Sequence, residues 1–215
     1  MHMIQSVIFD VGGVVCSFDW HRFFMFLSEH SYVSTEKLEA TLRASGCIES
    51  FERGLMTPNQ FYAAVCSESR AHISKTQFKK EFTVFTARKE IYPVLTALSR
   101  EVPLGLLSNT NLLHTEYIID KLPCRKLFPI VNFSYLTGYL KPEPASYQLC
   151  LESLSCEPED ALFVDDNPEN IAGAVALGMK TILFSSVHGL VTELKRYDLL
   201  TTGLSRKSTF LLRHA

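Results

Sequence analysis

The sequence predicts an α/β fold: a doubly wound, Rossmann-like parallel sheet of five strands in the order 3-2-1-4-5, with an inserted helical cap domain. Two observations predict the sheet. Short apolar runs alternate with helical patterns from residue 90 onward, and two of the apolar runs end in acidic turns. A third observation predicts the insertion, because residues 10–102 separate the first run from the second and are too many for one crossover helix.

Five apolar runs account for the strands, and each is typical of a strand buried on both faces. They are Ile4–Phe9, Pro103–Leu107, Pro129–Phe133, Ala161–Val164 and Thr181–Phe184. The helix after the fourth run has recognisable end signals, since Asn167 suits its cap, Pro168 suits its first position and Gly178 can end it. This alternation of strand and helix is the pattern of a doubly wound sheet.

The segment between the first two strands predicts a small helical cap, because no strand pattern competes there with the helical ones. The helical patterns cover Trp20–His30, Thr35–Ser45, Thr57–Ser69 and Ser74–Phe85. Ser74 and Gln77 are spaced as a capping box, and Thr57-Pro58 is a typical helix start. We expect the cap to cover the carboxyl edge of the sheet like a lid. The expected division is an α/β core of residues 1–15 and 87–200, a cap of residues 16–86 and a C-terminal tail of residues 201–215.

Composition and charge exclude several functions. The chain is 47% hydrophobic and 20% charged with a net charge of −2, which gives no electrostatic footprint for nucleic acid or an anionic membrane. No apolar run reaches the ~20 residues of a membrane span, and no signal peptide is evident. The six cysteines form no CxxC pair and no zinc-like spacing, so we expect reduced thiols in a cytoplasmic protein. The oligomeric state stays open.

Three carboxylates are expected at one edge of the sheet. Asp10 follows the first strand and enters a glycine-containing turn, and Asp165-Asp166 follow the fourth strand. The carboxyl ends of parallel strands share one edge, where ligands bind. Two such charges ~4 Å apart repel by ~4 kcal/mol at an effective dielectric near 20, so the group needs a cation or a proton. Acidic oxygens with a catalytic task most often hold Mg²⁺, which is the predicted cofactor.

Two further segments offer groups that suit a phosphate. Ser108-Asn109, at the end of the second strand, presents a hydroxyl and a free backbone N–H, and both suit a phosphate oxygen. Lys141 lies at the start of a helix, where its ammonium can neutralise both a transferring phosphoryl group and the carboxylates. Structural alternatives exist: Ser108 as a cap for the helix beginning near Asn111, and Lys141 as a solvated lysine.

Taken in order, these segments resemble the haloacid dehalogenase-like hydrolase superfamily over the whole chain. More narrowly, they resemble its branch of sugar-phosphate phosphatases related to α-D-glucose-1-phosphate phosphatase. The motifs that carry the resemblance are Leu107-Ser108-Asn109-Thr110-Asn111 with His114-Thr115, Lys141-Pro142-Glu143, and Phe163-Val164-Asp165-Asp166-Asn167 with Asn170-Ile171. The segment Phe51-Glu52-Arg53-Gly54 with Phe61 also looks like the cap of that branch, although Glu52 and Arg53 suit a solvated pair equally well.

The resemblance implies a mechanism with an aspartyl-phosphate intermediate. Asp10 would be the nucleophile, and water would hydrolyse the intermediate. Mg²⁺ would be held by Asp10, the backbone carbonyl of Gly12 and Asp166, with Asp165 contributing directly or through water. Ser108, the Asn109 amide and Lys141 would hold the phosphoryl oxygens, so the resemblance implies Asp10, Lys141 and Ser108 as the catalytic set. The implied substrate is a small phosphorylated metabolite, and we expect a sugar phosphate.

One position departs from the superfamily pattern. Most of its phosphatases have a second aspartate two residues after the nucleophile, as acid for the leaving oxygen and base for water, and this chain has Gly12 there. The resembling branch shares a glycine at that position. General acid–base help is worth roughly 10²–10⁴-fold, so the loss predicts a slow enzyme rather than a dead one. Asp19 and His114 are candidate replacements, with a capping aspartate and a satisfied structural histidine as the simpler interpretations.

Two rival functions follow from the same residues. A catalytically weak or silent protein of this fold would use the cleft to bind a phosphorylated ligand, and Gly12 keeps that alternative open. A 2-haloacid dehalogenase would use the same aspartate nucleophile without a metal. The Asp165-Asp166 pair disfavours it, because a metal-independent enzyme has no need of paired acids there.

Overall fold

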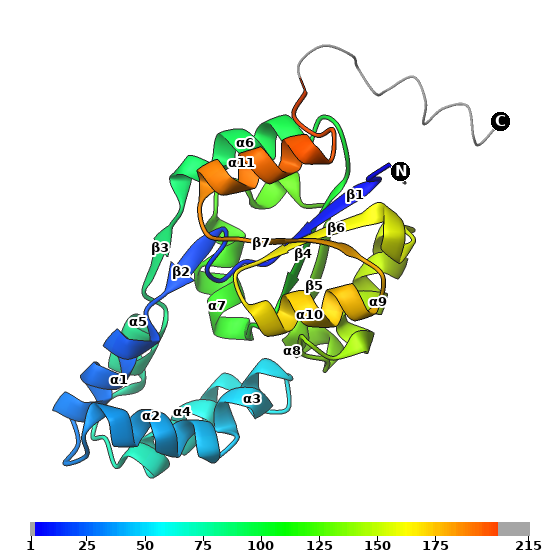
Figure 1. Ribbon diagram of the computed structural model, residues 1–215. Coiled ribbons are helices and arrows are strands. Elements are labelled where there is room, and N and C mark those ends of the chain that lie inside the picture. The colour runs from blue at the N-terminus through cyan, green and yellow to red at the C-terminus, as the bar shows by residue number, and fades with distance from the viewer. Residues whose placement is uncertain (1–2, 202–215) are drawn as a thin grey trace.

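The computed structural model describes residues 3–201, so the predicted tail lies outside the described residues apart from Thr201. Five strands form one parallel sheet in the order β5-β4-β1-β6-β7 (Figure 1). Their bounds are β1 Ser6–Phe9, β4 Leu104–Ser108, β5 Ile130–Phe133, β6 Ala161–Asp165 and β7 Lys180–Leu183. The predicted order 3-2-1-4-5 and the doubly wound fold are therefore confirmed.

The register of the central strands aligns their carboxyl ends. Phe9 of β1 lies opposite Leu106 of β4 on one side and Val164 of β6 on the other. The next residue, Asp10, donates its backbone N–H to the Val164 carbonyl at 2.9 Å, which extends the pairing by one step. The residues that end these three strands therefore meet at one edge of the sheet.

Helices cover both faces of the sheet, in agreement with the buried runs of the sequence. One face carries α6 (Tyr92–Leu98), α7 (Leu112–Tyr117) and α11 (Val187–Arg196), which pack against Val7 and Phe9 of β1. The other carries α9 (Pro144–Leu154) and α10 (Pro168–Ala176), which pack around Ile8. The short helix α8 (Ser134–Thr137) follows β5 directly, and 3₁₀ turns span Lys89–Ile91, Ile119–Lys121, Arg125–Leu127 and Pro158–Asp160.

The end signals of α10 have the predicted roles. The Asn167 side chain accepts the Glu169 N–H at 2.9 Å, and Pro168 occupies the first helical position, where a missing N–H costs nothing. Gly178 follows the last turn with a φ of +88°, a left-handed conformation that favours glycine. Asn167 therefore fixes the direction of the helix immediately after the acidic pair.

The inserted segment forms five helices around an aromatic core of its own. They are α1 (Trp20–Glu29), α2 (Thr35–Ala44), α3 (Cys47–Glu52), α4 (Pro58–Ser69) and α5 (Lys75–Phe82). Stacked and edge-on phenylalanine rings, among them Phe51, Phe61 and Phe82, fill the space between the helices. The predicted capping box at Ser74 begins α5, and the predicted helix start at Thr57 begins α4, where Thr57 also forms a capping box with Gln60. We call residues 16–86 the cap.

Two cap features correct the sequence analysis. A two-stranded antiparallel ribbon of β2 (Cys16–Phe18) and β3 (Phe85–Ala87) joins the cap to the core, so the expectation that no strand forms there is wrong. Strands of three residues are too short to leave a periodic pattern. The sequence analysis also missed α3, which starts after Gly46 with no side-chain cap to signal it. The predicted domain boundaries fall at this ribbon, and the division itself stays a prediction.

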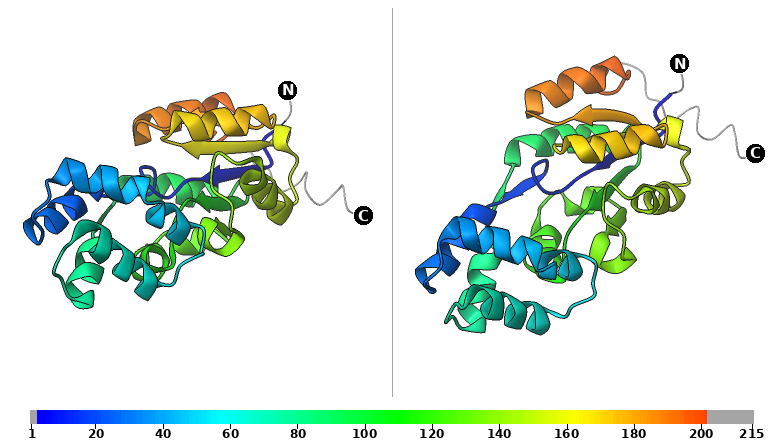
Figure 2. Two further views of the ribbon diagram at one scale, coloured as in Figure 1. Left: turned by 90° about the horizontal axis from the view of Figure 1, so that it is seen from below. Right: turned by 60° about the horizontal axis from the view of Figure 1, so that its bottom comes forward.

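In the three views of Figures 1 and 2, the cap helices lie beyond the carboxyl ends of the strands. Helix α3 is the part of the cap that packs against α8, which follows β5 at that edge. The end of α3 therefore lies at the carboxyl edge of the sheet, next to α8. Among residues 3–201, no helix has the length and apolar character that a membrane span requires.

Candidate functional site

Lys141 lies between two carboxylates at the carboxyl edge. Its Nζ is 2.8 Å from Asp10 Oδ1 and 2.6 Å from Asp165 Oδ2, and its side chain is 1% exposed. Burial alone would lower the pKa of Lys141, but the two carboxylates outweigh it and raise the pKa. The interpretation of Lys141 as a solvated lysine is therefore wrong.

The Asn109 side chain fixes the backbone of Lys141. Its amide nitrogen donates to the Lys141 carbonyl at 2.9 Å, and its oxygen accepts the Lys141 N–H at 2.8 Å. This two-point contact joins the loop after β4 to the loop before α9. The amide thus positions the ammonium, a role that the spacing of the two motifs does not reveal.

The paired aspartates have different surroundings. Asp165 is fully buried, and both its oxygens accept hydrogen bonds, from Lys141 Nζ, the Asn167 N–H and the Asn170 side chain. Asp166 is exposed, and its carboxylate lies against Gly13. A Cβ on Gly13 would lie 2.0 Å from Asp166 Oδ2, and Gly13 has a φ of +73°, so this position requires glycine.

The acidic cluster fits a divalent cation. Asp10, Asp165 and Asp166 each offer one carboxylate oxygen, and the three atoms lie within 4.8 Å of one another. Burial raises the pKa of Asp10 to about 6 against the opposing effect of Lys141, and burial and Asp165 raise the pKa of Asp166. Carboxylates that resist ionisation in this way gain from a bound cation, and hard oxygen ligands suit Mg²⁺.

Ser108 does not cap the following helix. It is buried at the end of β4, while Asn111 caps α7 by accepting the His114 N–H at 3.0 Å. The capping interpretation of Ser108 is therefore wrong. Among the side-chain hydrogen bonds of residues 3–201, none involves the Ser108 hydroxyl, so that group stays available to a ligand at the edge.

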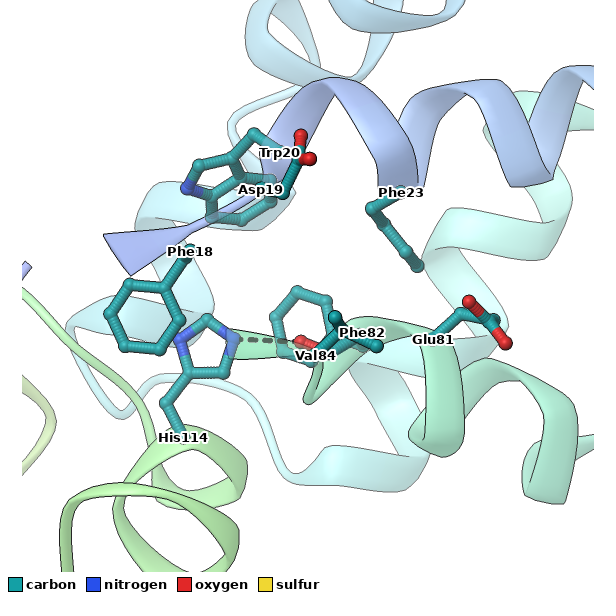
Figure 3. A pocket seen from close by; sticks show the side chains of 8 residues that line it. All are labelled: Phe18, Asp19, Trp20, Phe23, Glu81, Phe82, Val84 and His114. Atoms are coloured by element: carbon teal, nitrogen blue, oxygen red, sulfur yellow. Dashed lines mark hydrogen bonds between the residues drawn. The ribbon is translucent and has the colours of Figure 1, made fainter. Parts of the chain in front are cut away.

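His114 has a structural role. Its ring stacks between Phe18 and Phe82 at centroid distances of 4.4 Å, with Nε2 3.0 Å from the Phe82 carbonyl (Figure 3). Its Nδ1 lies 3.2 Å from the Asn111 side chain. Burial lowers its pKa to about 4. The crevice beside it has a volume of about 10 Å³, room for roughly one water molecule. Neither the ring nor the crevice suits proton transfer to a substrate.

Gly12 and Asp19 both lie in the segment between β1 and α1. The Asp19 side chain caps α1 by accepting the Arg22 N–H at 2.9 Å, which is the simpler of its two interpretations. Gly12 does not have a left-handed φ, and a Cβ there would meet only the Phe18 ring, at 3.6 Å. Position 12 therefore has no geometric need for glycine.

Sequence reasoning did not foresee how the cap contacts the core. Arg53 forms an ion pair with Glu143 and donates to the Gly138 carbonyl at 2.9 Å, so it is not a freely solvated side chain. Ser134 donates its hydroxyl to the Glu52 carbonyl at 2.6 Å. These partners are 82 to 90 residues apart in the sequence, and no local pattern signals them.

Several curated proteins are similar to this chain in sequence. Acyl-CoA dehydrogenase family member 10 of Mus musculus is 32% identical over 204 residues, which are 89% of this chain and 19% of that protein. Drimenol cyclase drtB of Aspergillus calidoustus is 25% identical over 188 residues, and the chain spans 34% of its length. Phosphatase MT3486 of Mycobacterium tuberculosis is 27% identical over 190 residues, covering 84% of this chain and 87% of that protein. The chain thus spans about a fifth and a third of the first two relatives.

Solved structures share the fold. The HAD family enzyme bt-2542 from Bacteroides thetaiotaomicron superposes with a TM-score of 0.78 at 24% identity, over 85% of this chain and 94% of the other. Its complex with magnesium and inorganic phosphate gives 0.76 at 23% identity with the same coverage. The L-2-haloacid dehalogenase RSc1362 gives 0.62 at 24% identity, over 83% and 85% of the two chains.

A family model decides the classification. The model of haloacid dehalogenase-like hydrolases matches residues 4–178, which include both acidic turns, the Ser108 loop, Lys141 and the whole cap. The chain belongs to the haloacid dehalogenase-like hydrolase family.

Proposed function

We propose that the chain is a Mg²⁺-dependent phosphomonoester hydrolase that acts through an aspartyl-phosphate on a small phosphorylated metabolite, in particular a sugar phosphate. The observation that carries this proposal is the Lys141 ammonium, buried between Asp10 and Asp165 with Asp166 beside them. Phosphoryl transfer depends on such positioned positive charge, because the transferring group carries negative charge on three oxygens. The relative named phosphatase MT3486 and the neighbour in complex with magnesium and phosphate support it.

In this mechanism Asp10 is the nucleophile. One of its carboxylate oxygens bonds to phosphorus while the bond from phosphorus to the ester oxygen breaks. Lys141, held by Asn109 and Asp165, contacts the transferring group, and the Ser108 hydroxyl donates to one of its oxygens. Water then attacks phosphorus, which releases inorganic phosphate and frees Asp10.

The metal ligands follow from the acidic cluster. We assign Asp10, Asp166 and the Gly12 carbonyl to the ion, with Asp165 contributing directly or through water, since both Asp165 oxygens already accept protein hydrogen bonds. When bound, Mg²⁺ neutralises the carboxylates and the developing charge on the phosphoryl oxygens. We also infer a cytoplasmic location, which the six free cysteines support.

A p-nitrophenyl phosphate assay with and without Mg²⁺ tests the proposal. Release of p-nitrophenol that requires Mg²⁺ is the expected result. Chloride release from 2-chloropropionate without metal would instead indicate a dehalogenase. Binding of inorganic phosphate with no turnover of either compound would indicate a silent phospholigand-binding protein, the alternative that Gly12 favours. A screen of phosphorylated metabolites, sugar phosphates first, then identifies the substrate class.

A further inference from the structure

We propose that Glu52, at the end of cap helix α3, is the acid and base that the reaction lacks at position 12. The inference rests on the proposed phosphatase function. The role of general acid and base is unassigned, because Asp19 caps α1 and both His114 ring nitrogens are engaged. A group that replaces the missing aspartate must reach the leaving oxygen, which points from the sheet edge toward the cap.

The backbone of Glu52 is bound to the loop that follows β4. Its carbonyl accepts the Ser134 hydroxyl at 2.6 Å, and the same Ser134 oxygen accepts the Thr110 N–H at 2.9 Å. Thr110 is two residues beyond Ser108, the predicted phosphate ligand. One buried hydroxyl thus connects the end of α3 to the loop that carries a phosphate-binding group.

A second contact binds the next cap residue to the loop between α8 and α9, which carries Lys141. Arg53 forms an ion pair with Glu143, which lies two residues after Lys141, and donates to the Gly138 carbonyl at 2.9 Å. Gly54 then passes so close to α8 that a Cβ there would lie 2.2 Å from the Tyr135 carbonyl oxygen. The backbone of Glu52 and its two successors is therefore anchored to α8 and to the segment that follows it, which contacts the Ser108 loop and carries Lys141.

The Glu52 carboxyl group itself has no bound partner. Within residues 3–201, no hydrogen bond or ion pair involves its side-chain oxygens, although Glu52 is partly buried. Burial raises the pKa of Glu52 to about 7. Arg43 of the cap and Lys141 of the core oppose this rise, whereas Glu49 of the cap and Asp10 of the core add to it. A carboxyl group balanced near neutral pH can both give and take a proton.

The proton steps balance as follows. In the first step the Asp10 oxygen bonds to phosphorus, the ester P–O bond breaks, and the neutral Glu52 carboxyl gives its proton to the leaving oxygen, which departs as an alcohol. In the second step the Glu52 carboxylate takes a proton from water as the water oxygen bonds to phosphorus. The bond from phosphorus to Asp10 breaks, and Glu52 is neutral again.

Glu52→Gln tests the role, because the amide keeps the shape but cannot donate this proton. The variant is compared with the unmodified protein on propyl phosphate and p-nitrophenyl phosphate, with saturating Mg²⁺. We expect kcat/KM, which reports only the steps up to departure of the leaving group, to fall about 10²–10⁴-fold for propyl phosphate, whose leaving oxygen needs a proton. For the aryl ester the loss of kcat/KM should be at least tenfold smaller. The unmodified protein should lose propyl phosphate turnover as pH rises through about 7, and the variant should lack this limb.

Two further variants separate catalysis from structure. Glu68→Gln removes the same charge from an exposed site on α4 and should leave the ratio of the two rates unchanged. Gly12→Asp in the Glu52→Gln background restores an acid at the family position, where a Cβ meets only Phe18, and should recover propyl phosphate turnover. A purely structural Glu52 would not be rescued in this way.

The outcomes distinguish this inference from the proposed function. Equal losses of kcat/KM on both esters, or no loss, with a normal melting temperature would overturn the role of Glu52 while leaving the phosphatase in place. An unmodified protein that hydrolyses neither ester would overturn both. If Glu52→Gln does not fold, Glu52→Asp, whose acid is one methylene shorter, must still show a larger loss of kcat/KM on propyl phosphate than on the aryl ester. Equal losses there also reject the role.

Discussion

The sheet edge and the cap present their buried acids in opposite ways. Asp165 at the edge is fully buried, and protein donors occupy both its oxygens. Glu52 on α3 is held by its backbone alone, with no partner for its carboxyl group among the described residues. A carboxylate whose oxygens both accept hydrogen bonds positions its neighbours, whereas an unpartnered one is open to proton exchange with a ligand. The comparison separates groups that organise the site from groups that react in it.

The largest expected effect concerns the nucleophile, the reactive acid on the core side. Asp10→Asn should reduce turnover of p-nitrophenyl phosphate on the order of 10⁴-fold or more, because an amide of nearly the same shape does not attack phosphorus. Circular dichroism should show an intact fold. Activity above a few per cent in the folded variant would rule out the covalent mechanism.

Removal of Lys141, which organises the buried carboxylates, should cause a large loss of stability. Lys141→Met removes the ion-pair partner that Asp10 and Asp165 share within residues 3–201 and leaves two buried carboxylates facing each other. The free energy of unfolding, measured by urea denaturation in a chelating buffer, should fall by about 3–5 kcal/mol. As a matched control, Arg196→Ala breaks an exposed ion pair with Glu193 and should cost at most about 0.5 kcal/mol. Similar losses in the two variants would contradict the organising role of Lys141.

The response to Mg²⁺ should distinguish the role of Asp166 from that of Asp165. Asp166 is exposed, so Asp166→Ala should change metal-free stability by no more than about 0.5 kcal/mol. In the unmodified protein, Mg²⁺ at a hundred times its Kd should add about 2.7 kcal/mol of stability, visible as a higher melting temperature. Asp166→Ala should abolish that rise. A metal-dependent rise that persists in the variant would place the ion elsewhere.

Much of the core could be predicted from the sequence because its signals are local. Each sheet strand is an apolar run, and Asp10, Ser108 and the acidic pair end a strand or follow it directly. The placement of Lys141 at the start of a helix is wrong, because α9 begins only at Pro144 and Lys141 lies in the loop before it. Because the strands are parallel, their carboxyl ends lie at the same edge of the sheet. The sequence therefore predicted that Asp10, Lys141 and the acidic pair would share one edge.

The cap was predicted less completely because its decisive contacts are distant. Strands β2 and β3 pair only three residues each across the whole insertion, and α3 begins without a capping side chain. The position of Glu52 depends on Ser134 and, through Arg53, on Glu143, which lie 82 and 90 residues away from their partners. The sequence drew attention to Asp19 and His114 instead, and only the structure shows that other groups occupy them.

The smallest expected effects come from two adjacent glycines, which repeat the contrast between a tight and an open environment. Gly13 has a φ of +73°, and a Cβ there would lie 2.0 Å from the Asp166 carboxylate. Gly13→Ala should therefore lower the free energy of unfolding by more than about 1 kcal/mol, and it should weaken the Mg²⁺-dependent rise in melting temperature because Asp166 must move.

Gly12 lacks a left-handed φ, and its Cβ would touch only the Phe18 ring at 3.6 Å. Gly12→Ala should leave stability unchanged or raise it by up to about 1 kcal/mol, since alanine restricts the unfolded chain, and the metal response should persist. Urea denaturation of the two variants with and without Mg²⁺ measures both effects. Equal losses at the two positions would mean that the first turn is uniformly tight, and the rescue of Glu52→Gln by an aspartate at position 12 would then fail for want of space.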